Sequence, residues 1–202
     1  IGVYKSHNFS FEKLICQGMF IPQPTIFLRK TLLQKTGSLD ETLSTTMDYD
    51  FCIRLGLFGK CKYIPAFLAT RRIHEETKTE QKKEMFYFDA LKSLDKLFNR
   101  PDLPVSLIKL KNCAYGNRHR IGAFTYFNKR DYKNSKFLLR KAVVEYKRFS
   151  FYQWLSIISV YLQCLAGKQI ITPGFSKRLK DRVYGRAQEN KTLNWMNDII
   201  SR

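Results

Sequence analysis

The chain has 202 residues, 44% of them apolar, and a formal net charge of +19. This length and apolar content indicate a globular chain with a packed core and room for one domain plus an appendage. The five cysteines are scattered without a CxxC pair, which argues against a zinc knuckle or a complete disulfide framework and favours reduced thiols in the cytosol.

The positive charge is concentrated in the second half of the sequence. Residues 1–84 hold 13 basic and 9 acidic side chains, a net +4, whereas residues 85–202 hold 23 and 8, a net +15. A field of this sign attracts nucleic acid, anionic lipid or phosphorylated ligands without selecting among them. The chain begins with Ile1 and shows no secretory signal pattern, so we expect it to be a fragment that lacks an upstream part.

Short elements are predicted over residues 19–73. An extended, proline-interrupted segment leads into the apolar run 26–28, and a short helical stretch then ends at Gly37. A second helix is expected at about 47–58, with Thr45 or Thr46 as its cap and Gly59 after its end. Residues 61–73 are typical of β-structure. This mixture predicts an α/β layer for residues 1–84.

Long helices are predicted after about residue 84. Apolar residues recur at helical spacing around 138–146, with basic residues on the other side, and a second helical pattern precedes them around 118–127. The sequence "NKRDY" forms a tight connection between the two. We therefore expect an all-α extension over residues 85–202, with an antiparallel helical hairpin at about 107–148.

Residues 149–167 carry no charge, which raises the question of a membrane span. Gln153, Ser156, Ser159 and Gln163 nevertheless form a polar stripe at steps of three, three and four residues. Such a stripe favours a helix packed on protein, then one lying in a membrane interface, over one surrounded by lipid.

Two acids stand one residue apart at the start of the predicted helix 47–58. Asp48 lies in the first turn, where free N–H groups and the positive end of the helix dipole stabilise an anion. Asp50 is about 200° further around the helix, so the two carboxylates cannot face the same point. Arg54 follows Asp50 at ion-pair spacing. From these residues alone, two interpretations of Asp48 are about equally supported: a functional carboxylate, or an acid that only stabilises the helix dipole.

One histidine, His74, stands where the β-rich segment gives way to a polar loop. A lone loop histidine is more often solvated than a ligand. Its neighbours Arg72 and Lys78 allow a second interpretation, in which the loop holds a phosphorylated ligand or a divalent metal.

The segment 20–79 combines four features in order. These are a Gln-Pro segment before an apolar run ending in Arg-Lys, a Gly-x-x-Asp-Glu turn, an acid-rich helix start with a following Arg, and a final Ala-x-x-Arg-x-His. In this combination the segment resembles the second half of the catalytic domain of family 2 glycosyltransferases. The resemblance implies a partial GT-A, Rossmann-like α/β half-domain over residues 1–84 and an inverting sugar transfer from a nucleotide-sugar donor to a saccharide or lipid-linked acceptor.

The resemblance also implies roles for individual residues. It makes Asp48 the catalytic base that deprotonates the acceptor hydroxyl, although Met47 stands where the family often has Glu. Gln23, Pro24 and Thr25 match the segment that borders the acceptor cleft. Arg72 and Lys78 would supply positive charge to the substrate, and His74 would approach the metal or the diphosphate. Asp50 and Arg54 remain structural supports of the helix.

The family's Asp-x-Asp metal motif and nucleotide-binding half are not found before residue 20. The expected cofactor is Mg²⁺ or Mn²⁺, with its main ligands absent from this sequence, so the isolated fragment is expected to be inactive. The family further implies polysaccharide biosynthesis in the cytoplasm, with peripheral contact to an anionic membrane at its inner face.

Two other functions stay open on the sequence. A non-catalytic, glycosyltransferase-like scaffold would fit the missing nucleotide half. A basic helical binding module would use the aromatic and basic residues interleaved over 115–132, but no nucleic-acid motif accompanies them.

Overall fold

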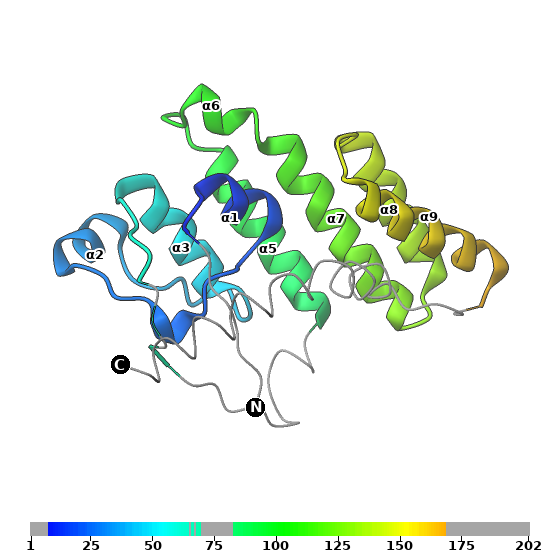
Figure 1. The fold of residues 1–202 in the computed structure, drawn as a ribbon, viewed down its shortest axis with the longest axis horizontal. Coiled ribbons are helices and arrows are strands. Elements are labelled where there is room, and N and C mark those ends of the chain that lie inside the picture. The colour runs from blue at the N-terminus through cyan, green and yellow to red at the C-terminus, as the bar shows by residue number, and fades with distance from the viewer. Residues whose placement is uncertain (1–7, 65, 67, 70–82, 169–202) are drawn as a thin grey trace, which may run out of the picture.

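The structure is a computed structural model that describes residues 8–64, 66, 68–69 and 83–168. Within these residues it contains helices and no strand (Figure 1). The elements in chain order are α1 (Phe11–Gln17), the 3-10 helix η1 (Gln23–Thr25), α2 (Lys30–Thr36), α3 (Met47–Phe58), α5 (Lys83–Phe98), α6 (Val105–Ile108), α7 (Lys111–Asn128), α8 (Tyr132–Glu145) and α9 (Phe151–Ala166).

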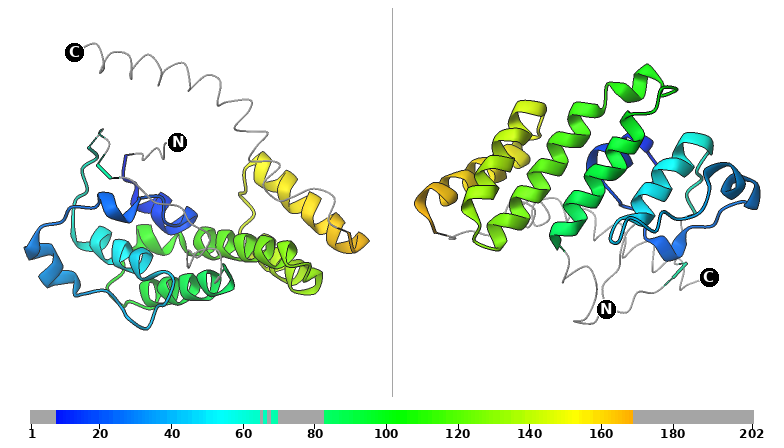
Figure 2. Two further views of the ribbon diagram at one scale, coloured as in Figure 1. Left: turned by 90° about the horizontal axis from the view of Figure 1, so that it is seen from below. Right: turned by 180° about the vertical axis from the view of Figure 1, so that it is seen from behind.

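The helices α3, α5, α7 and α8 lie side by side in a row (Figures 1 and 2). The short helix α2 packs on α3 at one end of the row, and α9 packs on α8 at the other. Helix α1 contacts both α3 and α7, so it ties one end of the row to its middle. The long helices α5 and α7 therefore form the centre of the molecule.

A first hydrophobic core joins α1 and α3 to α5 and the start of α7. Leu14 and Ile15 of α1 are fully buried there, and they share the cluster with Leu94 of α5 and Ala114 of α7. At about 25 cal/mol per Å² of buried apolar surface, such side chains stabilise the packing of the short α1 far more than its own helix propensity does. This core joins helices from both sides of residue 84, and the domain division predicted there stays a prediction.

A second core lies between α7, α8 and α9. Phe127 of α7, Leu139 of α8 and Val160 of α9 are almost completely buried in it. Helix α7 approaches α8 closely at Gly116, where an added Cβ would collide with the Cβ of Tyr146. A glycine at this position is required by the close contact between the two helices.

Several sequence predictions are confirmed because they depend on neighbouring residues. Helix α3 has the expected bounds, and α2 ends at Gly37, whose φ of 76° lies in the left-handed region that favours glycine. The hairpin appears as α7 and α8. The structure adds that Asp131, in the predicted connection, caps α8 through a hydrogen bond from the Asn134 N–H. Helices are likewise present over the described residues 85–168.

The prediction of an α/β half-domain over residues 1–84 is wrong, because the described part of this segment is mainly helical and contains no strand. Residues 26–28 and 61–64, which were expected to be extended or β-rich, have no regular secondary structure. A β-strand requires a neighbour to satisfy its backbone N–H and C=O groups, and no neighbouring strand exists in the described residues. The apolar side chains of Phe27 and Ile64 in these segments are 75% and 50% exposed.

Helix α9 covers most of the uncharged segment 149–167, and its capping box is complete, with Ser150 and Gln153 bonded to each other's backbone. Its polar stripe faces the protein in part, since Ser156 and Gln163 are buried. The preferred interpretation, packing on protein, is confirmed for this face. No helix in the described ranges is both long enough and apolar enough to cross a membrane.

Candidate functional site

The start of α3 brings together the two acids that the sequence singles out. Asp48 is half-buried, and its Oδ1 accepts a hydrogen bond from the Tyr49 N–H at 2.8 Å. A carboxylate in a first helical turn is stabilised by the free N–H groups and the dipole of the helix. Among the described residues, no cation forms an ion pair with Asp48.

Asp50 has a different environment and a different role. It is only 3% exposed, and its Oδ2 accepts a hydrogen bond from Arg54 Nε at 2.9 Å. Arg54 also donates from Nη1 to the backbone oxygen of Thr36, so the pair joins α3 to the end of α2. The ion pair predicted from the spacing of Asp50 and Arg54 is therefore present, and it supports the helix.

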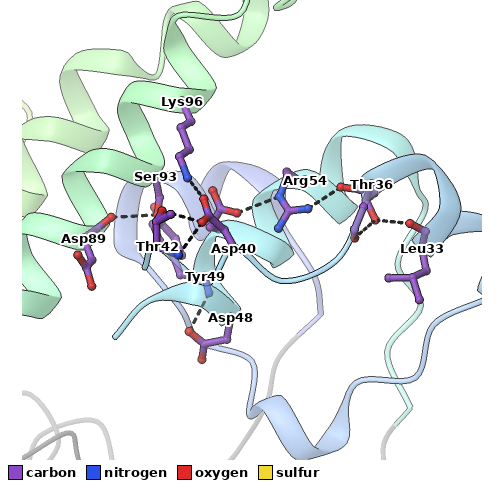
Figure 3. A network of polar contacts seen from close by, with 12 residues as sticks. Leu33, Thr36, Asp40, Thr42, Asp48, Tyr49, Arg54, Asp89, Ser93 and Lys96 are labelled. Carbon is purple, nitrogen blue, oxygen red and sulfur yellow. Dashed lines mark hydrogen bonds and ion pairs between the residues drawn. The ribbon is translucent and has the colours of Figure 1, made fainter. Parts of the chain in front are cut away.

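The two carboxylates point in different directions, as their separation around the helix predicts. In Figure 3 the side chain of Asp48 points away from Arg54, Asp40 and Lys96. Asp48 therefore takes no part in the hydrogen bonds and ion pairs that neutralise Asp50. Two aspartates in one helical turn thus divide into a buried structural acid and a half-exposed acid.

Asp89, a buried residue of α5, fixes the loop that precedes Asp48 in the chain. Its Oδ2 accepts hydrogen bonds from the Thr45 N–H at 3.0 Å and the Thr45 hydroxyl at 2.8 Å. Burial opposes the charge of Asp89, but the bonds from Thr45 and the nearby Lys92 outweigh it and hold its pKa below the ordinary value. Of the two predicted cap residues, Thr46 is the N-cap of α3, without a side-chain capping bond.

A pocket of about 280 Å³ lies beside this network, between the loop before α3, α3 itself and α5. Its charged lining residues are Asp40, Asp50, Arg54, Lys96 and Arg100. Each cation has an acidic partner: Lys96 bonds to Asp40, Arg54 to Asp50, and Arg100 to Asp102 at 2.7 Å. The bond from Lys96, together with those from Thr42, holds the pKa of Asp40 well below its usual range. The charges that line the pocket are therefore neutralised by ion pairs within the protein. Asp48 is not among the lining residues.

The predicted acceptor segment forms η1. Gln23 and Pro24 are exposed, and the Thr25 hydroxyl donates to the backbone oxygen of Pro22 at 2.7 Å. Within the described part of the chain, no hydrogen bond joins residues 23–25 to Asp48. Arg72, His74 and Lys78 lie outside the described residues.

The expected metal has no visible ligand set. The described ranges contain no group of three His, Cys, Asp or Glu side chains that could hold a metal ion. Asp50 is bonded to Arg54, and Asp48 points away from Arg54 (Figure 3). Asp48 and Asp50 therefore do not form a metal centre with other described residues.

Sequence reasoning missed Asp89 and Lys96, and it did not predict the pairing of Asp40, which it noted only as part of the Gly-x-x-Asp-Glu turn. Asp89 contacts Thr45 across 44 positions of the chain, and Lys96 contacts Asp40 across 56. No local spacing signals such pairs. The Asp40-x-Thr42 turn, in which Asp40 accepts from the Thr42 N–H at 2.9 Å, was the one local signal available.

Comparisons with family models, curated proteins and solved structures find no match to this chain. The family resemblance of residues 20–79 accordingly depends on the sequence pattern of those residues alone.

Proposed function

We propose that this chain carries the acceptor-side catalytic residue of an inverting glycosyltransferase, with Asp48 as the general base. The observation that carries the proposal is the difference between the environments of the two aspartates at the start of α3. Asp50 is buried and neutralised by Arg54, while Asp48 is half-exposed and directed away from that pair. The ordered pattern of residues 20–79 supports the same assignment.

The chemistry requires one ionised carboxylate within hydrogen-bond reach of the attacking hydroxyl. The acceptor oxygen forms a bond to the anomeric carbon as the bond from that carbon to the diphosphate oxygen breaks. The acceptor proton passes to Asp48, and the nucleoside diphosphate leaves from the opposite face, which inverts the configuration.

The nucleotide-sugar donor would be bound by residues outside those that the structure describes. Arg72, His74 and Lys78 remain the proposed contacts for the diphosphate side, and Gln23, Pro24 and Thr25 the proposed border of the acceptor site. The acceptor is a saccharide or a lipid-linked saccharide, and the site of action is the cytoplasmic face of a membrane.

A nucleic-acid function has less support. Of the aromatic residues that would have to stack on bases, Phe127 is fully buried against Tyr132, and the Tyr115 hydroxyl donates to Asp95 at 2.5 Å. Arg118 lies over the Tyr49 ring, 4.6 Å from its centroid. Base stacking requires exposed aromatic faces, and these side chains are engaged within the protein.

The test uses the protein expressed from its complete gene, incubated with UDP- and GDP-hexoses and a membrane glycolipid extract. We expect release of a nucleoside diphosphate and a product whose new glycosidic bond has the opposite anomeric configuration to the donor, measured by NMR. A product with retained configuration, or no turnover of any donor, would contradict the proposal. The second result would favour a non-catalytic scaffold.

A further inference from the structure

Helix α9 exposes an entirely apolar stripe. The stripe residues are 41% to 71% exposed and recur at steps of four, three, four and three: Phe151, Leu155, Ile158, Leu162 and Leu165. This spacing places them on one face of the helix. Helix α9 lies at one edge of the molecule, so nothing in the described chain packs over that end of the row (Figure 2).

The opposite face of α9 is less apolar than the exposed one. It buries Ser156 and Gln163 together with Ile157, Val160 and Cys164. Ser156 donates its hydroxyl proton to the Gln153 backbone oxygen at 2.8 Å, so this polar group is satisfied within the helix. A helix that only covers a globular core normally shows the reverse arrangement, with its polar residues toward water. The exposed stripe therefore indicates a second apolar environment.

Basic residues flank α9 at both ends. Residues 146–168 carry three basic side chains and no acidic one, and the acid before them, Glu145, is bonded to His119 at 3.2 Å. Lys147 and Arg148 are exposed just before α9, and Lys168 is exposed just after it. On the neighbouring α8, exposed Arg140 donates to the Tyr161 hydroxyl at 2.8 Å, which adds another cation beside the helix.

These charges decide between two occupants of the stripe. A second copy of the chain would bring the same cations to the same face, within a molecule of net charge +19, and the like charges would repel. An anionic lipid surface offers apolar contact to the stripe and negative headgroups to the flanking cations at once. Charge complementarity therefore favours the lipid surface.

We propose that α9 lies in the plane of an anionic membrane interface, with the stripe Phe151, Leu155, Ile158, Leu162 and Leu165 at the boundary of the acyl chains. At 1.5 Å per residue, its 16 residues extend roughly 24 Å along the surface. The inference does not depend on the transferase proposal, since it uses no residue of α3.

The experiment is flotation of the protein with vesicles of phosphatidylcholine alone and of phosphatidylcholine mixed with phosphatidylglycerol. The stripe variant carries Leu155→Ser, Ile158→Ser and Leu162→Ser. The matched control carries Val105→Ser and Ile108→Ser, which change two exposed apolar residues of α6 at a distance from α9 (Figure 1). Circular dichroism checks that both variants keep the helical content of the wild type.

We expect the wild type and the control to bind mixed vesicles, and the stripe variant to lose binding by roughly tenfold or more, because three apolar side chains no longer leave water. Equal binding of the stripe variant would assign membrane contact to charge alone and overturn the proposal. No binding of the wild type, or equal binding to neutral vesicles, would also overturn it. So would a wild-type dimer in lipid-free solution that the stripe variant abolishes, since a second copy would then occupy the stripe.

Discussion

Arg54 Nε donates to Asp50 Oδ2 at 2.9 Å across one turn of α3, while Asp48, two residues earlier, lies outside this pair. Replacing Asp50 by Asn leaves a partly buried guanidinium without its anion. We expect Asp50→Asn to lower the free energy of unfolding by about 2 kcal/mol in urea titration.

Asp48→Asn is the matched control, since it makes the same chemical change two residues away. Because Asp48 is half-exposed and contacts mainly the helix start, we expect a change within about 0.5 kcal/mol. Equal destabilisation by both variants would contradict the division between a structural and a functional acid.

The acids of this region also predict how stability depends on pH. Hydrogen bonds hold the pKa values of Asp89 and Asp40 below the ordinary Asp value, and an unfolded Asp titrates near about 3.9. The unfolded state therefore binds protons at higher pH than the folded state does. The stabilisation is complete above about pH 5 and is lost as the pH falls through 4 toward the folded pKa values.

Urea unfolding between pH 7 and pH 3 measures this dependence. The double variant Asp40→Asn, Asp89→Asn should show a shallower fall in unfolding free energy over the acidic range than the wild type, although it is less stable at pH 7. Parallel curves for the two proteins would show that these acids are not linked to folding.

A thiol pair joins α1 to α7 and makes a further prediction. Cys16 is almost fully buried, and Cys113 stands in the first turn of α7. The hydrogen bond between the two side chains leaves the proton on Cys16, which raises the pKa of Cys16 and lowers that of Cys113 to about 7. Alkylation of Cys113 by iodoacetamide should therefore rise with a midpoint near pH 7.

Two variants of Cys16 serve as controls, one that keeps a hydrogen-bond donor to Cys113 and one that removes it. Cys16→Ser preserves a hydroxyl that can donate to Cys113, whereas Cys16→Ala removes it and should move the alkylation midpoint upward. Peptide mass spectrometry separates Cys113 from exposed Cys61. A wild-type midpoint near the ordinary cysteine pKa of about 8.5 would contradict the pairing.

The contact between α7 and α8 predicts the effect of a small substitution. In an isolated helix, Gly116→Ala would stabilise by about 1 kcal/mol. Here the added methyl group meets the Cβ of Tyr146, a position fixed by the backbone of the chain after α8. Thermal unfolding should therefore show a destabilised variant, by about 1 to 3 kcal/mol. A raised melting temperature would mean that the two helices are not in such close contact.

The parts of the fold that the sequence predicts are those decided within a few residues. The bounds of α3, the end of α2 at Gly37 and the tight connection between α7 and α8 all follow from local geometry. The Asp50 to Arg54 pair follows from helical spacing. Each of these depends on residues within one or two turns of a helix.

Strand formation and the contact of Asp89 with Thr45 both depend on residues that are distant in the chain. The sequence alone does not predict them correctly. The apolar segments 26–28 and 61–64 have β-like composition, but no strand pairs with them in the described residues, so their composition does not determine their conformation. Asp89 is an ordinary helical acid in sequence. Only the fold brings it to Thr45, where it holds the loop in front of Asp48.

The central claim is that Asp48 takes the proton of the acceptor hydroxyl, and the turnover of Asp48→Asn in the protein from the complete gene tests it most directly. Turnover should fall by about 10² or more while binding of the nucleotide-sugar, measured by calorimetry, is retained, because only proton transfer is lost. Asp102→Asn, which changes an exposed acid in the loop before α6, serves as the control and should keep wild-type turnover. Wild-type turnover in Asp48→Asn would contradict the account.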